Sequence, residues 1–262
     1  MSASAETSIL EVDCIRVQFG GLIAIASMTF HVNEGEIVSL IGPNGAGKTT
    51  AFNAITGFLQ PSAGEARYLG QRLNGLKPNQ VATLGLVRTF QKTSLFGGNT
   101  VFENILIGLH RQGRQGLVGV LLRLPGMRAE EARLREEVQE ILDFIGLAHR
   151  TEEVASALPY GEQRLLEVAV SLATHPKMLL LDEPASGMNP AETASFVKLV
   201  KRIQARGITV LLVEHDMRLV MGISDRVVVL NQGEIIAEGP PAEIQRHPEV
   251  IRAYLGQGAA HA

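Results

Sequence analysis

A glycine-rich loop directly after the apolar run of residues 37–41 has the spacing of a phosphate-binding site. Glycine backbones can turn their N–H groups toward a polyphosphate, and a helix that begins there adds the positive end of its dipole. Lys48 is then expected to reach the β- and γ-phosphates of a nucleotide, and Thr49 to offer its hydroxyl to Mg²⁺. A plain glycine-rich turn is the alternative, which the strand before the loop and the helix after it disfavour. The loop residues are Gly42, Pro43, Asn44, Gly45, Ala46, Gly47, Lys48, Thr49 and Thr50.

Two consecutive carboxylates, Asp182 and Glu183, follow a second apolar run at residues 178–181. The carboxyl end of a buried strand is the ligand edge of an open parallel sheet. Asp182 is expected to support Mg²⁺, and Glu183 to act as general base on a water that attacks the γ-phosphate. An acidic pair after a strand is by itself more often a helix cap. Its combination with the phosphate-binding loop favours the catalytic interpretation.

Length, charge and cysteine content exclude several classes of protein. The 262 residues suffice for a sizeable core, and the net charge of −3 gives no basic field for nucleic acid. Cys14 is the single cysteine, which suits a reducing compartment. Residues 1–8 lack the pattern of a signal peptide, and the chain has no apolar run of about 20 residues. Any role at a membrane is therefore expected to depend on a partner.

The order of apolar patterns predicts an α/β chain with a helical insertion. Strands and helices alternate before residue 92 and after residue 176, with short strands around Gly20-Gly21 and a strand at 86–90. Between 93 and 175 the apolar residues have helical spacing. We expect one domain over 9–256, with its core at 9–92 and 176–256, its helical subdomain at 93–175 and flexible tails at 1–8 and 257–262.

The heptapeptide Leu-Pro-Tyr-Gly-Glu-Gln-Arg opens a predicted helix about twenty residues before the two carboxylates. In this order of motifs, the chain resembles the ATP-binding subunits of ABC transporters. The signature of that family is Leu-Ser-Gly-Gly-Gln, with which Leu158 and Gly161 agree and from which Pro159, Tyr160 and Glu162 depart. The resemblance implies a P-loop NTPase fold with an N-terminal antiparallel β subdomain. It also implies that Gly161 and Glu162 contact ATP held by an opposite subunit.

Four further positions match the family. The resemblance implies that Phe19 stacks on adenine, that Gln91 contacts Mg²⁺ and the attacking water, and that His215 bonds the γ-phosphate. Asn189 ends the turn that couples the two ATP sites in the family, where many members carry aspartate. Taken singly, three of these residues have structural alternatives. Phe19 could be a core residue of a strand, Gln91 an ordinary loop glutamine, and His215 a structural histidine at a strand end.

Longer motifs are similar to one subunit of the branched-chain amino acid importers. They are Glu-Pro-Ala-Ser-Gly-Met-Asn-Pro, Val-Glu-His-Asp-Met and the ending Tyr254-Leu255-Gly256. The resemblance implies an ATPase that powers uptake of branched-chain or other hydrophobic amino acids. Urea and amide importers share most of these traits. A soluble ABC ATPase without transport would carry coiled coils, a zinc hook or a second cassette, and a non-hydrolysing module would not need Glu183, Gln91 and His215.

The resemblance also implies partners and a location. Each ATP would lie between the phosphate loop of one subunit and the Gly161 helix of a second ABC ATPase subunit. The departures from the family signature favour a heterodimer with a different ATPase subunit, and a homodimer is the alternative. Leu95, Phe96 and Phe102 lie where the family receives the transmembrane permease. The protein would then sit on the cytoplasmic face of the inner or plasma membrane as a peripheral subunit, and a periplasmic or extracellular substrate-binding protein would act indirectly.

Overall fold

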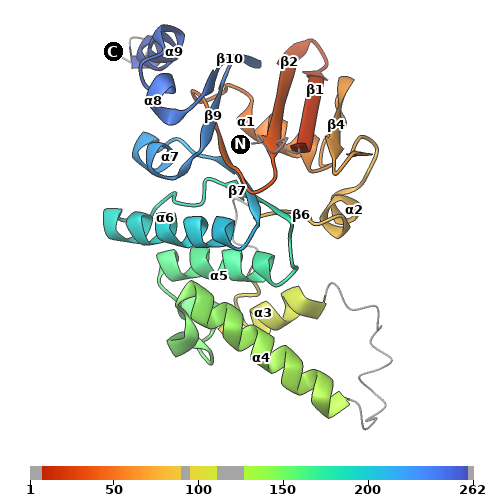
Figure 1. Ribbon diagram of the computed structural model, residues 1–262, viewed down its shortest axis with the longest axis vertical. Helices are drawn as coiled ribbons and strands as arrows, with labels where there is room; N and C mark the ends of the chain where they lie inside the picture. Colours follow the sequence, from red (N-terminus) through yellow and green to blue (C-terminus); the bar gives the residue numbers. More distant parts are fainter. Residues whose placement is uncertain (1–7, 90–94, 111–126, 259–262) are drawn as a thin grey trace, which may run out of the picture.

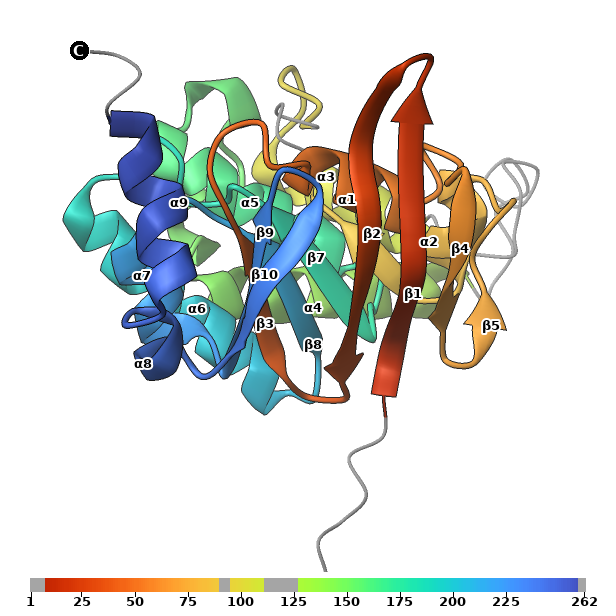
Figure 2. The ribbon, with the colours of Figure 1, turned by 90° about the horizontal axis from the view of Figure 1, so that it is seen from above.

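The computed structural model describes residues 8–89, 95–110 and 127–258, and the strands of this part of the chain form one ten-stranded sheet (Figures 1 and 2). The strands are β1 (Ser8–Phe19), β2 (Leu22–Asn33), β3 (Ile37–Ile41), β4 (Ala63–Tyr68), β5 (Gln71–Arg72), β6 (Leu86–Arg88), β7 (Met178–Asp182), β8 (Thr209–Val213), β9 (Arg226–Asn231) and β10 (Glu234–Gly239).

The sheet has a parallel half and an antiparallel half, in the order β5-β4-β1-β2-β10-β9-β3-β8-β7-β6. Strands β9, β3, β8, β7 and β6 are parallel, whereas β1, β2, β4 and β5 are antiparallel. Strand β10 joins the halves, because it pairs with β9 antiparallel and with β2 parallel. Every residue of β3, β7 and β8 is buried, as expected for parallel strands covered on both faces.

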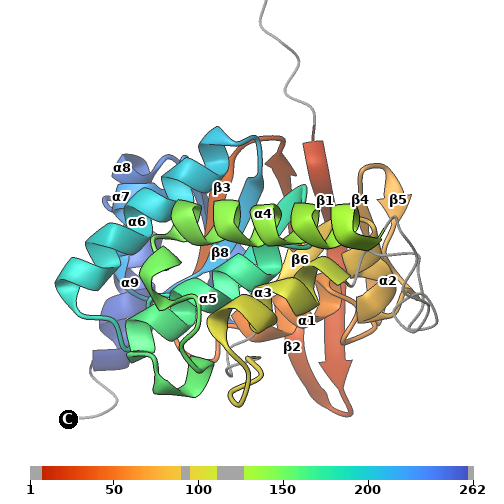
Figure 3. The same cartoon turned by 90° about the horizontal axis from the view of Figure 1, so that it is seen from below.

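Helices cover the sheet and extend away from it on one side. Figure 3, the view from below, has α3, α4 and α5 in the foreground. None of the helices in the described ranges is both long enough and apolar enough to cross a membrane. The α-helices are α1 (Lys48–Ile55), α2 (Pro78–Thr83), α3 (Val101–His110), α4 (Met127–Ile145), α5 (Tyr160–Leu172), α6 (Pro190–Ala205), α7 (Met217–Ile223), α8 (Pro241–Ile244) and α9 (Pro248–Gly258), and short 3₁₀ helices occur at Ala148–Arg150 and Ala155–Ala157.

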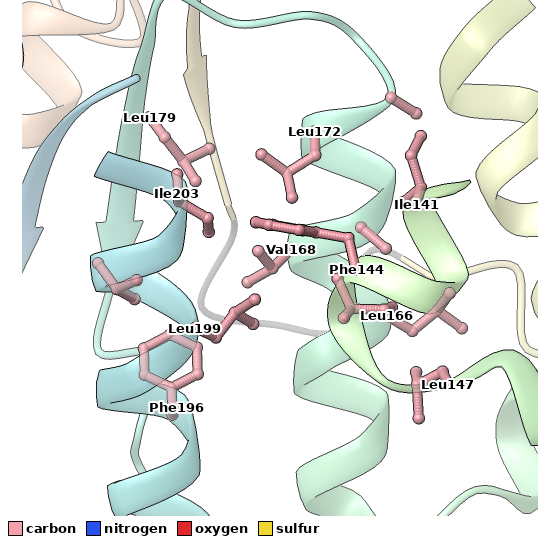
Figure 4. Packing of buried hydrophobic residues seen from close by; sticks show 14 of the residues in the cluster. Ile141, Phe144, Leu147, Leu166, Val168, Leu172, Leu179, Phe196, Leu199 and Ile203 are labelled. Carbon is pink, nitrogen blue, oxygen red and sulfur yellow. The ribbon is translucent and has the colours of Figure 1, made fainter. Parts of the chain in front are cut away.

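One large apolar cluster fixes the outer helices to the sheet. Figure 4 shows Phe144 of α4 reaching between α5 and α6, close to Val168 and Leu199. The guanidinium groups of Arg202 and Arg206 lie 4.5 and 3.5 Å from the centroid of the Phe144 ring. This packing gives the N-terminus of α5, where the signature heptapeptide begins, a defined place relative to the sheet.

The structure differs from the sequence predictions at three element boundaries. The strands around Gly20-Gly21 have 12 residues each instead of being short, because polar residues between the apolar ones face solvent and continue the pairing. Strand β6 ends at Arg88, and Phe90 lies outside the described residues. Ser8 belongs to β1 and residues 257 and 258 belong to α9, although the sequence analysis expects all three in flexible tails. The backbone of α9 continues one turn past Tyr254, which packs against an apolar cluster.

Candidate functional site

The phosphate-binding loop is enclosed by neighbouring backbone between β3 and α1. A Cβ atom on Gly42 would lie 2.0 Å from the carbonyl oxygen of Leu230, so no larger residue fits there. Gly47 has a φ of 107° and forms the N-cap of α1. The amide of Gly233, in the turn between β9 and β10, donates to the carbonyl of Ala46 at 2.9 Å. The loop therefore has a fixed conformation around the N-terminus of α1.

The positively charged amine of Lys48 lies against the backbone of this loop. Its buried amine donates to the carbonyl oxygens of Gly42 and Pro43, at 2.7 and 3.0 Å. Burial lowers the pKa of Lys48, and the negative charges of Glu183 and Asp182 act in the opposite direction. A charge held in a region of low dielectric interacts strongly with an incoming anion. The site therefore suits a phosphate group.

A cleft of about 390 Å³ brings the loop together with Glu183. One wall is the phosphate-binding loop from Asn44 to Thr50. Glu183 also lines the cleft, so the structure places the predicted base with Lys48 and Thr49. The other wall was not predictable from the sequence, because its residues come from the start of β2 and from a turn distant in sequence. That wall consists of Leu22, Ile23, Ala24 and Gln232.

The backbone leaves the sheet between the two carboxylates. Glu183 has a φ of 47°, and its amide donates to the carbonyl of Val213 at 2.9 Å. A left-handed conformation outside glycine is costly and is often found at functional sites. As a result, Asp182 stays buried at the end of β7 while Glu183 reaches the cleft.

Asp182 is paired with an arginine that the sequence analysis missed. Nη2 of Arg88 donates to Oδ2 of Asp182 at 2.6 Å, and the two side chains are only 8% and 2% exposed. Nη1 of Arg88 donates to Asn53 Oδ1 at 2.7 Å and approaches Thr56 Oγ1 at 3.3 Å. Arg88 thus connects β6, β7 and α1 behind the phosphate-binding loop. The sequence does show a charged residue at the end of an apolar strand. Its pairing with Asp182 could be predicted only with the knowledge that β6 lies beside β7.

The residues present fit a magnesium ion that binds together with nucleotide. No group of three or more His, Cys, Asp or Glu residues arranged for a metal occurs within the ranges that the structure describes. The hydroxyl of Thr49 and the carboxylate of Asp182 are oxygen donors of the kind Mg²⁺ prefers, and phosphates supply further oxygens. Gln91, the third predicted metal residue, lies outside the described residues.

Three other predicted residues are not among the described residues that line the cleft. Phe19 ends β1 and is 50% exposed, close in sequence to Leu22 at the cleft wall. The side chain of His215 is 58% exposed. The oxygen of Asn189 caps α6 and accepts from the amides of Ala191 and Glu192, at 2.9 and 3.0 Å. None of the three is among the described residues that line the cleft.

The described residues at the start of α5 do not line the cleft either. Pro159 is its N-cap and forms no side-chain cap hydrogen bond. A Cβ on Gly161 would lie 2.8 Å from Glu192 Oε1, so the backbone is closely covered there. The carboxylate of Glu162 is paired with Arg150 of the same chain at 3.0 Å.

Tyr160 packs against the turn that follows Glu183. A Cβ on Gly187 would lie 2.9 Å from Cε1 of Tyr160, so the ring leaves no room for a side chain at that position. The hydroxyl of Tyr160 accepts two hydrogen bonds from Arg164, at 2.6 and 3.0 Å. Tyr160, one of the departures from the family signature, therefore has a structural role within its own chain.

Glu214 is a second functional candidate that the sequence analysis missed. It is buried at the end of β8, where its carboxylate accepts from the amides of Ala185 and His215, at 2.9 and 3.1 Å. Burial raises the pKa of Glu214, although these hydrogen bonds lower it. Glu214 thus ties the segment of His215 to the turn after Glu183.

The pKa of Glu214 gives a test of this arrangement. Because its folded pKa is raised above the ordinary value of 4.5, ionisation costs stability as the pH rises from 4.5 through the folded pKa. The free energy of unfolding of the parent should fall over this range, relative to Glu214→Gln, by about 1.4 kcal/mol for each unit of the shift. Urea denaturation at several pH values measures the difference in slope. Parallel curves for the two proteins would contradict it, and Glu65→Gln on the exposed surface is the control.

Two family models match the chain. The model described as "ABC transporter" matches residues 25–186, which is more than half of the chain. The model described as "Branched-chain amino acid ATP-binding cassette transporter" matches residues 234–260, at the C-terminal end.

Curated relatives are similar along almost the whole chain. The "High-affinity branched-chain amino acid transport ATP-binding protein LivG" of Salmonella typhimurium is 46% identical over 250 residues, which cover 95% of this chain and 98% of the relative. The "High-affinity branched-chain amino acid transport ATP-binding protein BraF" of Pseudomonas aeruginosa is 44% identical over 250 residues, with the same coverage.

Solved structures share the fold. A nucleotide-free ATP-binding cassette from an ABC transporter has a TM-score of 0.82 and 32% identity, over 95% of this chain and 99% of the other. An ATP-binding cassette of an ABC transporter in its ADP conformation has a TM-score of 0.83 and 33% identity over the same shares. The predicted fold class is confirmed, and the chain belongs to the ABC transporter family as one of its ATP-binding cassettes.

Proposed function

We propose that this chain is the ATP-hydrolysing subunit of an importer for branched-chain or other hydrophobic amino acids. The observation that carries the proposal is the similarity over 95% of the chain to proteins named for high-affinity branched-chain amino acid transport. The C-terminal match to the branched-chain cassette model supports the same substrate class. The cleft that unites Lys48, Thr49 and Glu183 supports hydrolysis of ATP.

Each predicted site residue has one task in this reaction. Lys48 turns from the loop carbonyls to the β- and γ-phosphates. Thr49 and Gln91 would hold Mg²⁺, and Asp182 would support the metal. When bound, Mg²⁺ neutralises charge on the phosphate oxygens. Glu183 accepts the proton of the water that attacks the γ-phosphate, so the rate depends on the placement of its carboxylate.

A second cassette would complete the site. In this proposal, Gly161 and Glu162 at the start of α5 contact the ATP of the partner, and His215, Phe19 and Asn189 reach nucleotide only after the two chains close. In support, none of these residues is among the described residues that line the cleft. The side chain of Pro159 cannot form a hydrogen bond. This favours a companion subunit whose signature keeps the family's serine at that position. The cassette would span 9–256, with 93–175 as its helical subdomain.

The permease is proposed to bind near Phe96. The Phe96 ring is 56% exposed, although it is apolar. Asn104 fixes the backbone beneath it, because its amide group accepts from the Phe96 amide at 2.8 Å and donates to the Phe96 carbonyl at 3.1 Å. The protein would lie peripherally on the cytoplasmic face of the membrane, and a substrate-binding protein on the other side would deliver the amino acid.

Reconstitution with the permease and the companion subunit tests this function. Vesicles with the parent chain should take up leucine, isoleucine or valine when ATP is present on the cassette side. Lys48→Ala should raise the dissociation constant for ATP by about 10- to 100-fold and reduce uptake to background, because a buried cation that meets two phosphates is lost.

Lys201→Ala is the matched control, since that amine pairs with Asp225 on the surface at 3.4 Å. It should leave ATP affinity and uptake unchanged. Unchanged ATP affinity in Lys48→Ala would contradict the role of the loop. Transport of urea but of no amino acid would contradict the substrate class.

A further inference from the structure

Tyr160, at the start of α5, packs its ring against Gly187 in the turn that follows Glu183. A Cβ atom on Gly187 would lie 2.9 Å from Cε1, 3.4 Å from Cδ1 and 3.5 Å from Cζ of the ring. Gly187 also has a φ of 81°, a left-handed conformation that glycine adopts without strain. The ring and the backbone therefore both require glycine at this position, and α5 is in direct contact with the turn.

A buried ion pair fixes the ring to α5. Nη2 and Nε of Arg164 donate to the hydroxyl oxygen of Tyr160 at 2.6 and 3.0 Å, and Nη1 donates to Oε2 of Glu167 at 2.7 Å. The side chains of Arg164 and Glu167 are only 9% and 7% exposed. The guanidinium carbon lies 5.0 Å from the centroid of the Tyr160 ring. Because charge-assisted hydrogen bonds are strong and directional, the ring is held in one orientation relative to the helix.

The turn is attached to residues of the chain's own ATP site. The amide of Ser186 donates to the carbonyl of Glu183 at 3.2 Å. The amide of Ala185 donates to the buried carboxylate of Glu214 at 2.9 Å, and this carboxylate also accepts from the amide of His215 at 3.1 Å. The backbone of the proposed base and the segment of His215 are thus both bonded to the turn against which Tyr160 packs.

A second contact between the same two segments lies at the next residue of α5. A Cβ atom on Gly161 would lie 2.8 Å from Oε1 of Glu192, in the first turn of α6. Oε2 of the same carboxylate accepts from the amide of Asn189 at 2.8 Å, where the turn leads into α6. A displacement of the turn therefore reaches the backbone of Gly161, which the proposed two-chain arrangement places at the partner's nucleotide.

We propose that Tyr160 is a positioning residue that couples the two ATP sites of the dimer within one chain. This inference rests on the proposed two-cassette function. The ring makes the start of α5, which contacts the partner's ATP, move together with the turn after Glu183, which acts on the chain's own ATP. Close-packed groups transmit such a displacement because they cannot deform freely. The placement of α5 against one nucleotide and of Glu183 against the other then depend on each other.

Tyr160→Ala tests the coupling in the complex with the companion subunit and the permease. The kcat for ATP hydrolysis should fall about 10- to 100-fold, because small misplacements around a transition state have effects of this size. The dissociation constant of the isolated full chain for ADP, measured by titration calorimetry, should stay within about twofold, since the cleft around Lys48 is unchanged.

Tyr160→Phe is the matched control. It keeps the ring against Gly187 but loses the two hydrogen bonds from Arg164, so it reports a general loss of stability without loss of the contact. Its kcat should stay within about twofold of the parent value. Equal losses of kcat in the two variants would overturn the proposal, as would a loss of ADP affinity in Tyr160→Ala that matches its loss of activity.

A double-mutant cycle with Gly187→Ala identifies the contact as the cause. The added methyl group meets the ring in the parent but not in Tyr160→Ala, whereas the strain from the φ of 81° is present in both. Gly187→Ala should therefore lower kcat about 3- to 30-fold more strongly in the parent than in Tyr160→Ala. Additive effects would overturn the proposal, because a ring that acted by touching nucleotide directly would not depend on Gly187.

The same measurements separate this inference from the proposed function. A parent complex without ATPase activity would overturn the proposed function and this inference with it. An active parent complex with unchanged kcat in Tyr160→Ala would overturn the inference alone.

Discussion

Replacing Glu183 by glutamine is expected to slow ATP hydrolysis by about 10²- to 10⁴-fold while nucleotide binding is retained. Glutamine has nearly the same shape but cannot accept the proton of the attacking water. The backbone that positions the side chain is fixed by the hydrogen bond from the Glu183 amide to Val213, which the substitution leaves in place. Phosphate release under single-turnover conditions measures the rate, and titration measures the affinity.

Two further measurements sharpen this test. Glu65→Gln removes a carboxylate from the surface ion pair with Arg67 and should hydrolyse ATP like the parent. In the proposed two-chain arrangement, Glu183→Gln should also accumulate as an ATP-bound dimer in size-exclusion chromatography. Comparable turnover in Glu183→Gln and the parent would remove Glu183 from the role of general base.

Replacing Arg88 by methionine is expected to reduce the free energy of unfolding by about 3–5 kcal/mol. Methionine fills similar volume but leaves the carboxylate of Asp182, which is 2% exposed, without its cation. An uncompensated buried charge is far more costly than the loss of an exposed pair. Urea denaturation of the nucleotide-free chain measures the change directly.

A double substitution and a surface control identify the cause. Adding Asp182→Asn to Arg88→Met should recover much of the lost stability, because the buried charge is then removed as well. Arg67→Met breaks an exposed pair and should change stability by about 0–1 kcal/mol, since solvent screens that interaction. A loss below about 1 kcal/mol in Arg88→Met would contradict the proposed importance of the pair.

The sequence predicted the glycine-rich loop between β3 and α1 because the evidence for it is local, whereas the fold class also depended on the resemblance to the ABC family. A strand, a glycine-rich loop and a helix follow one another without a break at residues 37–55, and each supports the interpretation of the next. The two carboxylates could be predicted for the same reason, since they end a buried strand at β7. The element order then favoured a helical insertion between two stretches of α/β pattern.

The contacts around Arg88 and Tyr160 could not be predicted in this way. Arg88 and Asp182 are 94 positions apart and meet because β6 pairs with β7, which the sequence does not specify. The contact between Tyr160 and Gly187 also depends on how α5 packs against a distant turn. The cap at Asn189 is different, since a cap residue followed three positions later by glutamate is readable locally.

Because strand β10 joins the two halves of the sheet, the protein cannot complete its fold during translation until this strand has been synthesised. Gly233, in the turn before β10, accepts a hydrogen bond from the amide of Ala26 in β2 and donates one to the carbonyl of Ala46 in the loop. The N-terminal strands and the loop therefore gain these contacts only after a segment synthesised much later has emerged. A ribosome must therefore release the chain through β10 before the N-terminal hairpin can be joined to the rest of the sheet. Nascent chains should remain unable to consume ATP until residues 234–239 have left the ribosome.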